Sequence, residues 1–242
     1  MKKNYQGKIK SIKNIALETY EMIIESELEN AKSGQFISIL CENKTMRRPF
    51  SISDFEKQDK KSLTTILFKA KGEGTNYLKS LNIDDKIDFL APLGNGFKIE
   101  NKKSLLVGAG IGIAPMLFLK KELNKNNVEN FLISGFKAQN EVIKGSDKTL
   151  VGGSVLDNLE QLIEDKNIEI IYSCGPKIVL QKIDELASKK NIKAQLAVEK
   201  VMACSIGVCR GCVIKLIRDN KIAHYSVCQD GPVFSGGEII WE

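Results

Sequence analysis

Residues 204–212 read CSIGVCRGC, and a further cysteine follows at Cys228. These four thiols have the spacing C-x4-C-x2-C-x15-C, and the first two gaps are those of plant-type [2Fe–2S] ferredoxins. Gly207 and Gly211 lie inside the stretch, where glycine allows backbone N–H groups to approach the sulfides of a cluster. We expect the fourth ligand to arrive from a later strand. Because an iron–sulfur cluster passes one electron at a time, the stretch predicts a protein that moves electrons.

The same four cysteines also allow other interpretations. Disulfides are disfavoured because nothing in the sequence suggests an oxidising compartment. A zinc ion held by four cysteines also binds through short hairpins, although such sites usually contain two C-x2-C pairs and only Cys209 and Cys212 form one here. A cluster, a zinc ion and unligated thiols therefore stay open on the residues alone. Outside this group, Cys41 is most simply a small core residue.

The composition is that of an ordinary globular chain. Its 242 residues allow two domains, or two with a small appendage. The net charge of +6 comes from lysines scattered among acidic residues, as in residues 54–61 (DFEKQDKK), which indicates a solvated surface rather than a nucleic-acid platform. No apolar run approaches the roughly 20 residues of a membrane span. Residues 1–7 (MKKNYQG) lead into no apolar segment, so we expect a cytoplasmic protein with no membrane partner.

Residues 1–98 predict an all-β domain. Short apolar runs recur with turn signals between them, as expected of a small antiparallel barrel. The six expected strands lie near residues 7–9, 20–24, 35–40, 49–53, 63–68 and 86–90. Residues 92–96 (PLGNG) then form a turn-rich linker.

Residues 99–196 predict an α/β domain of the doubly wound type, with a parallel sheet. Strands and helices alternate here, which is typical of such domains. The expected strands are 104–107, 130–134 and 168–172, and the expected helices run through residue 123, over 156–163 and over 177–190. Residues 197–242 remain as a small C-terminal segment that carries the cysteines.

A glycine-rich turn follows the first strand of this α/β domain. Residues 108–115 read GAGIGIAP, and Gly108, Gly110 and Gly112 let the chain turn and bring N–H groups against a phosphate at a helix N-terminus. The stretch is not the G-x-G-x-x-G fingerprint, because Ile113 occupies the last glycine position. A structural turn and a nucleotide site are therefore both open.

A second turn, residues 173–176 (SCGP), ends the third strand with Cys174, Gly175 and Pro176. Ligands of open α/β sheets bind outside the carboxyl ends of the strands, so this turn and the glycine-rich one can face one pocket. A plain strand-to-helix connection, with Pro176 at the helix start, is the alternative.

The barrel carries its own motif. Residues 48–51 read RPFS, and residues 71–75 (KGEGT) follow the next strand. An arginine can grip a diphosphate, an aromatic ring can pack on a flavin, and glycine-rich backbone can present N–H groups to phosphate. The alternative is a strand in which Phe50 is core and Arg48 is solvated.

The order of these motifs along the chain resembles the ferredoxin-reductase superfamily, in which an FAD-binding barrel precedes an NAD(P)-binding domain. The tail is more specific. Residues 199–212 (EKVMACSIGVCRGC) and 227–234 (VCQDGPVF) resemble the electron-transfer subunit of class 1B dihydroorotate dehydrogenase. The resemblance runs the whole length, including residues 34–36 (GQF) and 92–97 (PLGNGF).

The resemblance implies a subunit that holds FAD and a [2Fe–2S] cluster and binds NAD. It implies a separate FMN-containing catalytic subunit that oxidises dihydroorotate to orotate in pyrimidine biosynthesis, in a heterotetramer with two subunits of each kind. Electrons would leave the FMN singly, cross the cluster to FAD, and depart as hydride to NAD+. No residue of this chain need transfer protons, and the only histidine, His224, is expected to have a surface or core role.

Carried over position by position, the resemblance implies three groups of site residues. The FAD contacts would be Arg48, Pro49, Phe50, Ser51, Leu67, Phe68, Lys69, Gly74 and Thr75. The NAD contacts are expected in the two turns, at Gly108, Gly110, Gly112, Cys174, Gly175 and Pro176. The cluster ligands would be Cys204, Cys209, Cys212 and Cys228.

The chain departs from the family pattern in three places. Lys69 stands where arginine is usual, which weakens bidentate phosphate binding. Ser205 replaces a glycine beside the first cluster ligand. Residues 137–156 are shorter than the usual segment, near the adenosine or nicotinamide end of the nucleotide. The choice between NAD and NADP stays open, because Lys137 can either contact a 2′-phosphate or be solvated.

Rival functions share this layout. The small subunit of an NAD(P)H–ferredoxin oxidoreductase, including electron-bifurcating types, is the nearest, although those relatives typically carry an aspartate as one cluster ligand. Oxygenase reductases place the fourth cysteine much farther downstream. A zinc-stabilised binding module without electron transfer predicts a colourless protein, whereas a flavin and a cluster predict a yellow-brown one.

Overall fold

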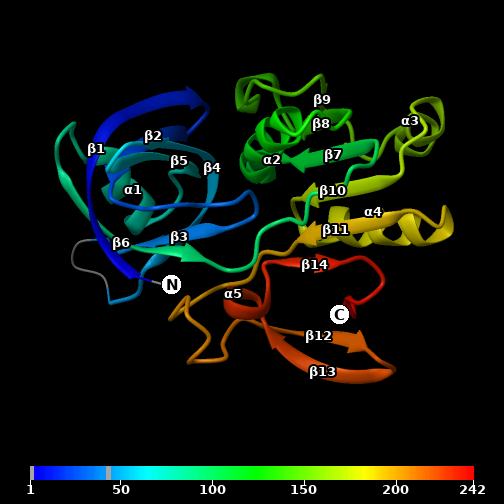
Figure 1. The fold of residues 1–242 in the computed structure, drawn as a ribbon. Coiled ribbons are helices and arrows are strands. Elements are labelled where there is room, and N and C mark those ends of the chain that lie inside the picture. The colour runs from blue at the N-terminus through cyan, green and yellow to red at the C-terminus, as the bar shows by residue number, and fades with distance from the viewer. Residues whose placement is uncertain (1–2, 42–44) are drawn as a thin grey trace.

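The computed structural model describes residues 3–41 and 45–242 and contains three parts (Figure 1). A closed barrel comes first, a six-stranded sheet with helices on both faces follows, and a two-stranded hairpin lies near the C-terminus. Met1 and Lys2, which begin the N-terminal stretch considered above, lie outside the described residues. The predicted architecture of barrel, α/β part and small cysteine-bearing segment is confirmed.

The barrel is antiparallel throughout, and its strand order β1-β2-β5-β4-β3-β6 closes on itself. Closure leaves no free sheet edge, and alternate side chains fill the interior. All six strands expected from the sequence are present. They are β1 (Lys3–Ala16), β2 (Thr19–Ser26), β3 (Phe36–Ile39), β4 (Arg48–Gln58), β5 (Lys61–Lys69) and β6 (Lys86–Leu93). One helix that the sequence analysis did not anticipate, α1 (Glu73–Ser80), follows β5 and buries Leu78 in the barrel core.

The sheet of the α/β part has the order β14-β11-β10-β7-β8-β9. Its parallel strands are β7 (Ser104–Ala109), β8 (Asn130–Phe136), β9 (Lys148–Val151), β10 (Ile170–Cys174) and β11 (Lys193–Ala197). The helices are α2 (Ile113–Lys125), α3 (Leu159–Asp165) and α4 (Lys177–Lys189), with short 3-10 turns η1 (Gly110–Gly112) and η2 (Gln139–Glu141). The predicted helix over 156–163 begins only at Leu159, because Asn158 has a φ of +60° and cannot belong to a right-handed helix.

Helices cover both faces of this sheet, as a doubly wound fold requires. Leu105 and Val107 of β7 pack with α3 and α4, whereas Leu106 between them packs with α2. The outer side of α2 lies against the barrel, where Lys121 Nζ is 2.8 Å from a carboxylate oxygen of Asp54 on β4. Within the described residues, no helix has the length and apolar character needed to cross a bilayer.

The C-terminal segment returns to the sheet after forming the hairpin. Strands β12 (Val213–Arg218) and β13 (Lys221–Ser226) pair with each other, and helix α5 (Val227–Asp230) follows directly. Strand β14 (Val233–Ser235) then pairs antiparallel with β11. The predicted parallel sheet therefore carries one antiparallel edge strand from the cysteine segment, which anchors that segment to the α/β part (Figure 1).

Candidate cluster, flavin and nucleotide sites

The four cysteines lie in two neighbouring parts of the C-terminal segment, which a hydrogen bond between the Cys228 N–H and the Cys212 sulfur brings together. Cys204, Cys209 and Cys212 come from the loop between β11 and β12, and Cys228 is the second residue of α5. The expectation that the fourth ligand lies on a strand was wrong, because β13 ends at Ser226 and the chain turns into a short helix before the cysteine. Cys212 and Cys228 are buried, whereas Cys209 is exposed.

Backbone N–H groups point at the sulfurs, as the glycines in the loop suggested. The N–H groups of Cys209, Gly211 and Cys228 donate to the sulfurs of Cys204, Cys209 and Cys212, each with an N···S distance of 3.4 Å. Such donors stabilise a thiolate relative to a thiol. The loop is therefore built to hold charged sulfur.

The pKa of Cys204 is lowered to about 6. Burial raises the pKa of this thiol, but hydrogen bonds from the backbone N–H groups of Ile206, Val208 and Cys209, together with the Cys209 side chain, outweigh that effect. The pKa of Cys228 is raised to about 12, first by burial and then by the neighbouring Cys212 thiol.

Two of these hydrogen bonds associate the cysteines in pairs, because the Cys209 N–H donates to the Cys204 sulfur and the Cys228 N–H donates to the Cys212 sulfur. Within residues 3–41 and 45–242, no three Cys, His, Asp or Glu side chains are arranged around one point to hold a single metal ion. In a [2Fe–2S] cluster bound by four cysteines, each iron takes two thiolates. The paired donor set fits that cluster.

The predicted flavin residues come together at one end of the barrel. Residues 48–51 begin β4, and Gly74 and Thr75 lie in the first turn of α1. Arg48 passes directly over Gly74, because a Cβ at that position would be 3.1 Å from Arg48 Nε. An arginine beside the positive end of a helix is a suitable environment for a phosphate group.

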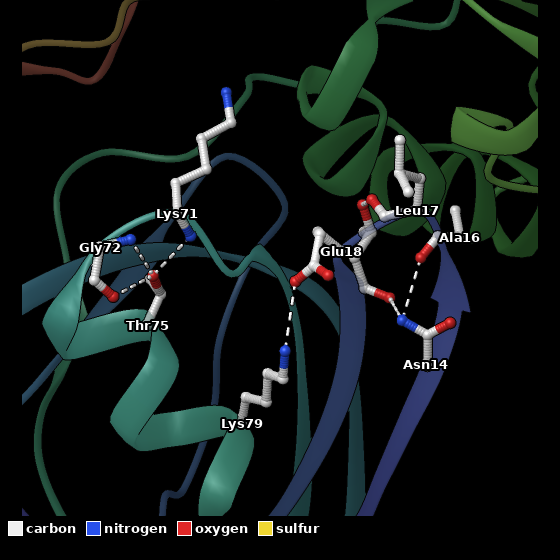
Figure 2. Close-up of polar contacts among 9 residues, drawn as sticks. Asn14, Ala16, Leu17, Glu18, Lys71, Gly72, Thr75 and Lys79 are labelled. Atoms are coloured by element: carbon white, nitrogen blue, oxygen red, sulfur yellow. Dashed lines mark hydrogen bonds and ion pairs between the residues drawn. The ribbon is translucent and has the colours of Figure 1, made fainter.

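The Thr75 hydroxyl organises the loop that enters α1 (Figure 2). Its Oγ1 accepts hydrogen bonds from the N–H groups of Lys71 at 3.0 Å and Gly72 at 3.1 Å, and donates to the Gly72 carbonyl at 3.0 Å. At the far end of the helix, Lys79 forms an ion pair with Glu18 of the β1–β2 turn (Figure 2). The loop is thus held in one shape, as a phosphate-binding backbone requires.

We expect Thr75→Val to weaken FAD binding about tenfold, since it removes two accepted hydrogen bonds of roughly 1 kcal/mol each while keeping the side-chain shape. Titration of flavin-free protein with FAD, followed by flavin fluorescence, measures the dissociation constant. Ser80→Ala is the matched control, because its hydroxyl caps the other end of the same helix by donating to the Tyr77 carbonyl. An unchanged dissociation constant for Thr75→Val would contradict this role.

The remaining predicted flavin residues are placed differently from one another. The Phe68 ring is buried and stacks on Tyr20 with a centroid distance of 5.6 Å, so only its backbone can meet a ligand. Phe50 packs edge-on against Phe68 and stays half-buried, which leaves part of its ring accessible. Leu67 is buried against the α/β part.

Lys69 forms an ion pair with Glu141 of η2, with 2.5 Å between Nζ and the carboxylate oxygen. This ion pair holds the pKa of Glu141 below its ordinary value. Nearby, the Leu17 N–H donates to the Asn140 carbonyl at 2.7 Å. The short segment 137–156 therefore reaches back to the barrel and engages the very lysine that departs from the family pattern. Sequence reasoning missed Glu141, and no local signal pointed to it.

The two predicted nucleotide turns touch each other. The parallel strands run β9-β8-β7-β10-β11 across the sheet, so the chain reverses its direction of travel between β7 and β10. A Cβ on Gly112 would lie 2.3 Å from the Cys174 carbonyl oxygen, and one on Gly175 would lie 2.8 Å from the Ala109 Cβ. The turns therefore meet at the switch point where doubly wound sheets bind dinucleotides.

Cys174 contributes to this site through its backbone. Its side chain is fully buried, and burial raises the pKa of the thiol well above its ordinary value. The sulfur is thus a packed, neutral group. Cys41 is likewise buried in the barrel core, as expected from the sequence.

Asn95 joins the barrel to the cysteine segment, which sequence reasoning did not foresee. Its backbone N–H donates to the Gly231 carbonyl at 2.5 Å, and its side-chain Nδ2 donates to the Asp230 carbonyl at 3.0 Å. Residues 92–96 were expected only to link two domains. Through Asn95 they also bind residues 230 and 231, which follow the fourth cysteine in the sequence.

Known proteins resemble both the cysteine segment and the chain over its full length. Residues 199–240 match the family model for the iron-sulfur cluster binding domain of dihydroorotate dehydrogenase B. This match favours the cluster over the zinc alternative, and no disulfide joins any two of the six cysteines, all of which lie in the described residues.

Among solved structures, that of the NADH-dependent reduced ferredoxin-NADP oxidoreductase superposes with a TM-score of 0.83 at 27% identity, covering 97% of this chain and 90% of that one. Phthalate dioxygenase reductase, at 16% identity and a TM-score of 0.65, shares the fold and covers 91% of this chain and 76% of its own.

Curated relatives cover the full length. The chain is 36% identical to the dihydroorotate dehydrogenase B (NAD(+)) electron transfer subunit of Caldanaerobacter subterraneus subsp. tengcongensis, with 100% of both chains aligned. It is 35% identical to the subunit of the same name from Listeria welshimeri, over 93% of this chain and 94% of that one. The chain therefore belongs to the family of dihydroorotate dehydrogenase B (NAD(+)) electron transfer subunits.

Proposed function

We propose that this chain relays electrons from a dihydroorotate-oxidising catalytic subunit that contains FMN to NAD+, in pyrimidine biosynthesis. The observation that carries the proposal is a segment with four cysteines, three of whose sulfurs accept backbone N–H hydrogen bonds, attached to a closed barrel and a doubly wound sheet. When bound, the cluster would carry single electrons and FAD would exchange either one or two, which matches one-electron supply to hydride acceptance by nicotinamide.

Within this proposal the chain has three domains, 1–98 for FAD, 99–196 for NAD and 197–242 for the cluster. The cluster residues are Cys204, Cys209, Cys212 and Cys228. The FAD residues are Arg48, Pro49, Phe50, Ser51, Leu67, Phe68, Lys69, Gly74 and Thr75. The NAD residues are Gly108, Gly110, Gly112, Cys174, Gly175 and Pro176.

The proposed roles follow from the contacts of these residues. Arg48 and the first turn of α1 would bind the FAD diphosphate through charge and backbone N–H groups. The Gly112 turn would let the NAD diphosphate approach the backbone, since no side chain intervenes there. The N–H groups around the cysteines would stabilise the charged sulfurs. None of these residues needs to transfer a proton.

Co-purification from the native cell, combined with an assay of dihydroorotate-dependent NAD+ reduction, tests the function. We expect an FMN-containing partner to accompany the chain, in a complex with two copies of each subunit, and NADH to form. A complex that oxidises dihydroorotate but leaves NAD+ unreduced would contradict the proposal that NAD+ is the terminal electron acceptor. The same assay with NADP+ in place of NAD+ shows which nucleotide the chain uses.

A second candidate function is the small subunit of an NAD(P)H–ferredoxin oxidoreductase. The TM-score of 0.83 to the NADH-dependent reduced ferredoxin-NADP oxidoreductase supports it. The four-cysteine donor set supports the dihydroorotate function instead, because the bifurcating relatives typically use an aspartate. A ferredoxin-linked partner in the co-purification would decide for the second candidate.

The loop around the cysteines is also the proposed docking surface for the catalytic subunit. Val201 and Val208 are 89% and 77% exposed, and Ile206 between them is also exposed, next to the exposed Cys209. Exposed apolar side chains at a redox centre suit an interface, because a cluster must come close to its electron donor.

We expect Val208→Asp to weaken the complex about tenfold or more, because a charge would be buried against the partner. Sedimentation or gel filtration with the catalytic subunit measures this. Ile83→Asp is the control, since Ile83 is 63% exposed but lies in the barrel away from the cysteines. Equal affinities for the two variants would place the interface elsewhere.

The proposed location is the cytoplasm. The three thiols of the cysteine loop accept hydrogen bonds from backbone N–H groups and none of them forms a disulfide, which suits a reducing compartment.

A further inference from the structure

A hydrogen bond joins the cysteine loop to the barrel at the residue that departs from the family pattern. The hydroxyl of Ser38 on β3 donates to the hydroxyl oxygen of Ser205, with 2.8 Å between the two oxygens. The two residues are 167 positions apart in the sequence, and Ser205 directly follows the first cysteine, Cys204. This bond therefore connects the flavin-type barrel to the cluster loop next to a sulfur.

Both serines are enclosed. Ser38 is 0% exposed and Ser205 is 1% exposed, so neither hydroxyl can be satisfied by bulk water. Removing one hydroxyl leaves the other buried without this hydrogen-bond partner. The loss of stability is then larger than when both hydroxyls are removed. The pair is thus a specific contact rather than an incidental surface one.

The backbone at Ser205 favours glycine, yet serine is present. Its φ of +61° lies in the left-handed region, which costs a residue with a Cβ more than it costs glycine. A glycine would adopt this turn more easily but would have no hydroxyl for Ser38. The hydrogen bond to Ser38 therefore offsets the conformational free energy that serine loses in the left-handed backbone.

The barrel end of the bond lies beside the proposed flavin residues. Ser38 is directly opposite Pro49 in the β3–β4 register, and Pro49 stands between Arg48 and Phe50. Arg47 also reaches the Ser38 carbonyl, at 3.4 Å, and pairs with Asp88. Ser38 therefore lies on a strand that hydrogen bonds hold in place, next to the proposed flavin residues of the barrel.

A second attachment holds the other side of the cysteine segment. Asn95 binds the carbonyls of Asp230 and Gly231, just after Cys228, as described above. The segment is therefore tied to the barrel side both after its first cysteine and after its last.

We propose that Ser205 is a positioning residue: its hydrogen bond with Ser38 holds the Cys204 end of the cluster loop against the barrel and thereby sets the separation between cluster and flavin. Because electron tunnelling falls steeply with distance, a loop that opens at this point would pass electrons more slowly. The inference rests on the proposed cluster and FAD residues.

The test compares Ser38→Ala, Ser205→Gly and the double variant in the intact complex. Two quantities are measured: the rate at which an iron chelator bleaches the cluster absorbance, and the rate at which NADH reduces the cluster through FAD in stopped flow. Loss of one hydrogen bond shifts local opening of the loop, so we expect chelator bleaching to be about fivefold faster in Ser38→Ala. The acceleration should be smaller in Ser205→Gly, because glycine adopts the left-handed backbone at this position more easily. We expect cluster reduction to be slower in each.

The double variant should be no worse than either single variant, because both singles remove the same contact. Ser62→Ala is the matched control. Ser62 is as buried as Ser38, but its hydroxyl donates to the Ser26 carbonyl, which also belongs to the barrel and not to the cysteine loop. It should lower the unfolding temperature without altering either rate.

Wild-type rates in Ser38→Ala and Ser205→Gly would overturn the inference while leaving the cluster site intact. Additive effects in the double variant would also overturn it, since the two residues would then act independently. A wild-type protein without the absorbance and EPR signal of a reduced [2Fe–2S] cluster would instead refute the cluster site itself, and this inference with it.

Discussion

We expect Cys209→Ser to lose the [2Fe–2S] cluster and all dihydroorotate-dependent NAD+ reduction, while FAD stays bound. In the proposed cluster Cys209 would share one iron with Cys204, whose sulfur accepts the Cys209 N–H, so its replacement would leave that iron with a single thiolate. The proposed flavin residues lie on β4 and α1, in a different part of the chain, and should keep their geometry. Visible absorbance, EPR of the reduced protein and FAD stoichiometry measure the outcome.

Cys41→Ala is the control for this variant. Cys41 is also a cysteine, but it is buried in the barrel core, so its loss should leave the cluster absorbance and EPR signal unchanged. Reduction of an artificial dye by NADH needs FAD alone and should persist in Cys209→Ser. Full cluster absorbance in Cys209→Ser would contradict the assignment of this ligand.

The second large effect is expected at the nucleotide switch point. Gly112 has no room for a side chain, because a Cβ would stand 2.3 Å from the carbonyl oxygen and 2.6 Å from the carbonyl carbon of Cys174. Both atoms are backbone, so they cannot move without shifting the end of β10. We expect Gly112→Ala to cost about 1–3 kcal/mol of stability and to abolish NAD-dependent activity. Chemical denaturation and NADH oxidation assays measure the two effects.

Gly175→Ala tests the same contact between the two turns, and a second substitution at Ala109 can relieve the clash that it creates. A Cβ on Gly175 meets the Ala109 Cβ at 2.8 Å, with the next atom 3.4 Å away. We expect the single variant to lose NAD-dependent activity and the double variant Ala109→Gly/Gly175→Ala to recover much of it. Failure of Ala109→Gly to rescue would mean that the clash is not the cause. Chemical reduction of the cluster should be normal in all of these variants, since the four cysteines proposed as its ligands are unchanged.

The barrel and the alternation of strands and helices were predictable because they depend on local periodicity. The run 86–90 alternates exposed or half-buried side chains with buried ones, and β6 appears there. The cysteine spacing was equally informative, because a single loop supplies three of the four sulfurs. The helix α1 was missed because five of its eight residues are polar and its second residue is a glycine, so no apolar repeat marks it. The late start of α3 at Leu159 depends on a left-handed Asn158, which has no distinctive neighbours in the sequence.

The contacts that join the parts were not predictable. Lys69 meets Glu141, Asn95 meets the chain after Cys228, and Ser38 meets Ser205 only after the barrel and the sheet have folded and packed. Each joins residues at least 72 positions apart, and no periodicity or spacing encodes such pairs. The contact between Gly112 and Cys174 likewise needs the strand order that places β7 beside β10.

The amino-acid sequence alone therefore predicted the class of each part and singled out four cysteines as candidate cluster ligands, because periodicity and spacing act over a few residues. Tertiary structure alone decided which cysteine N–H groups donate to which sulfurs, which lysine the short segment engages and which hydroxyl meets the serine beside the first cysteine. Those features depend on distances between segments, and such distances exist only once hydrophobic burial has brought the barrel, the sheet and the cysteine loop together.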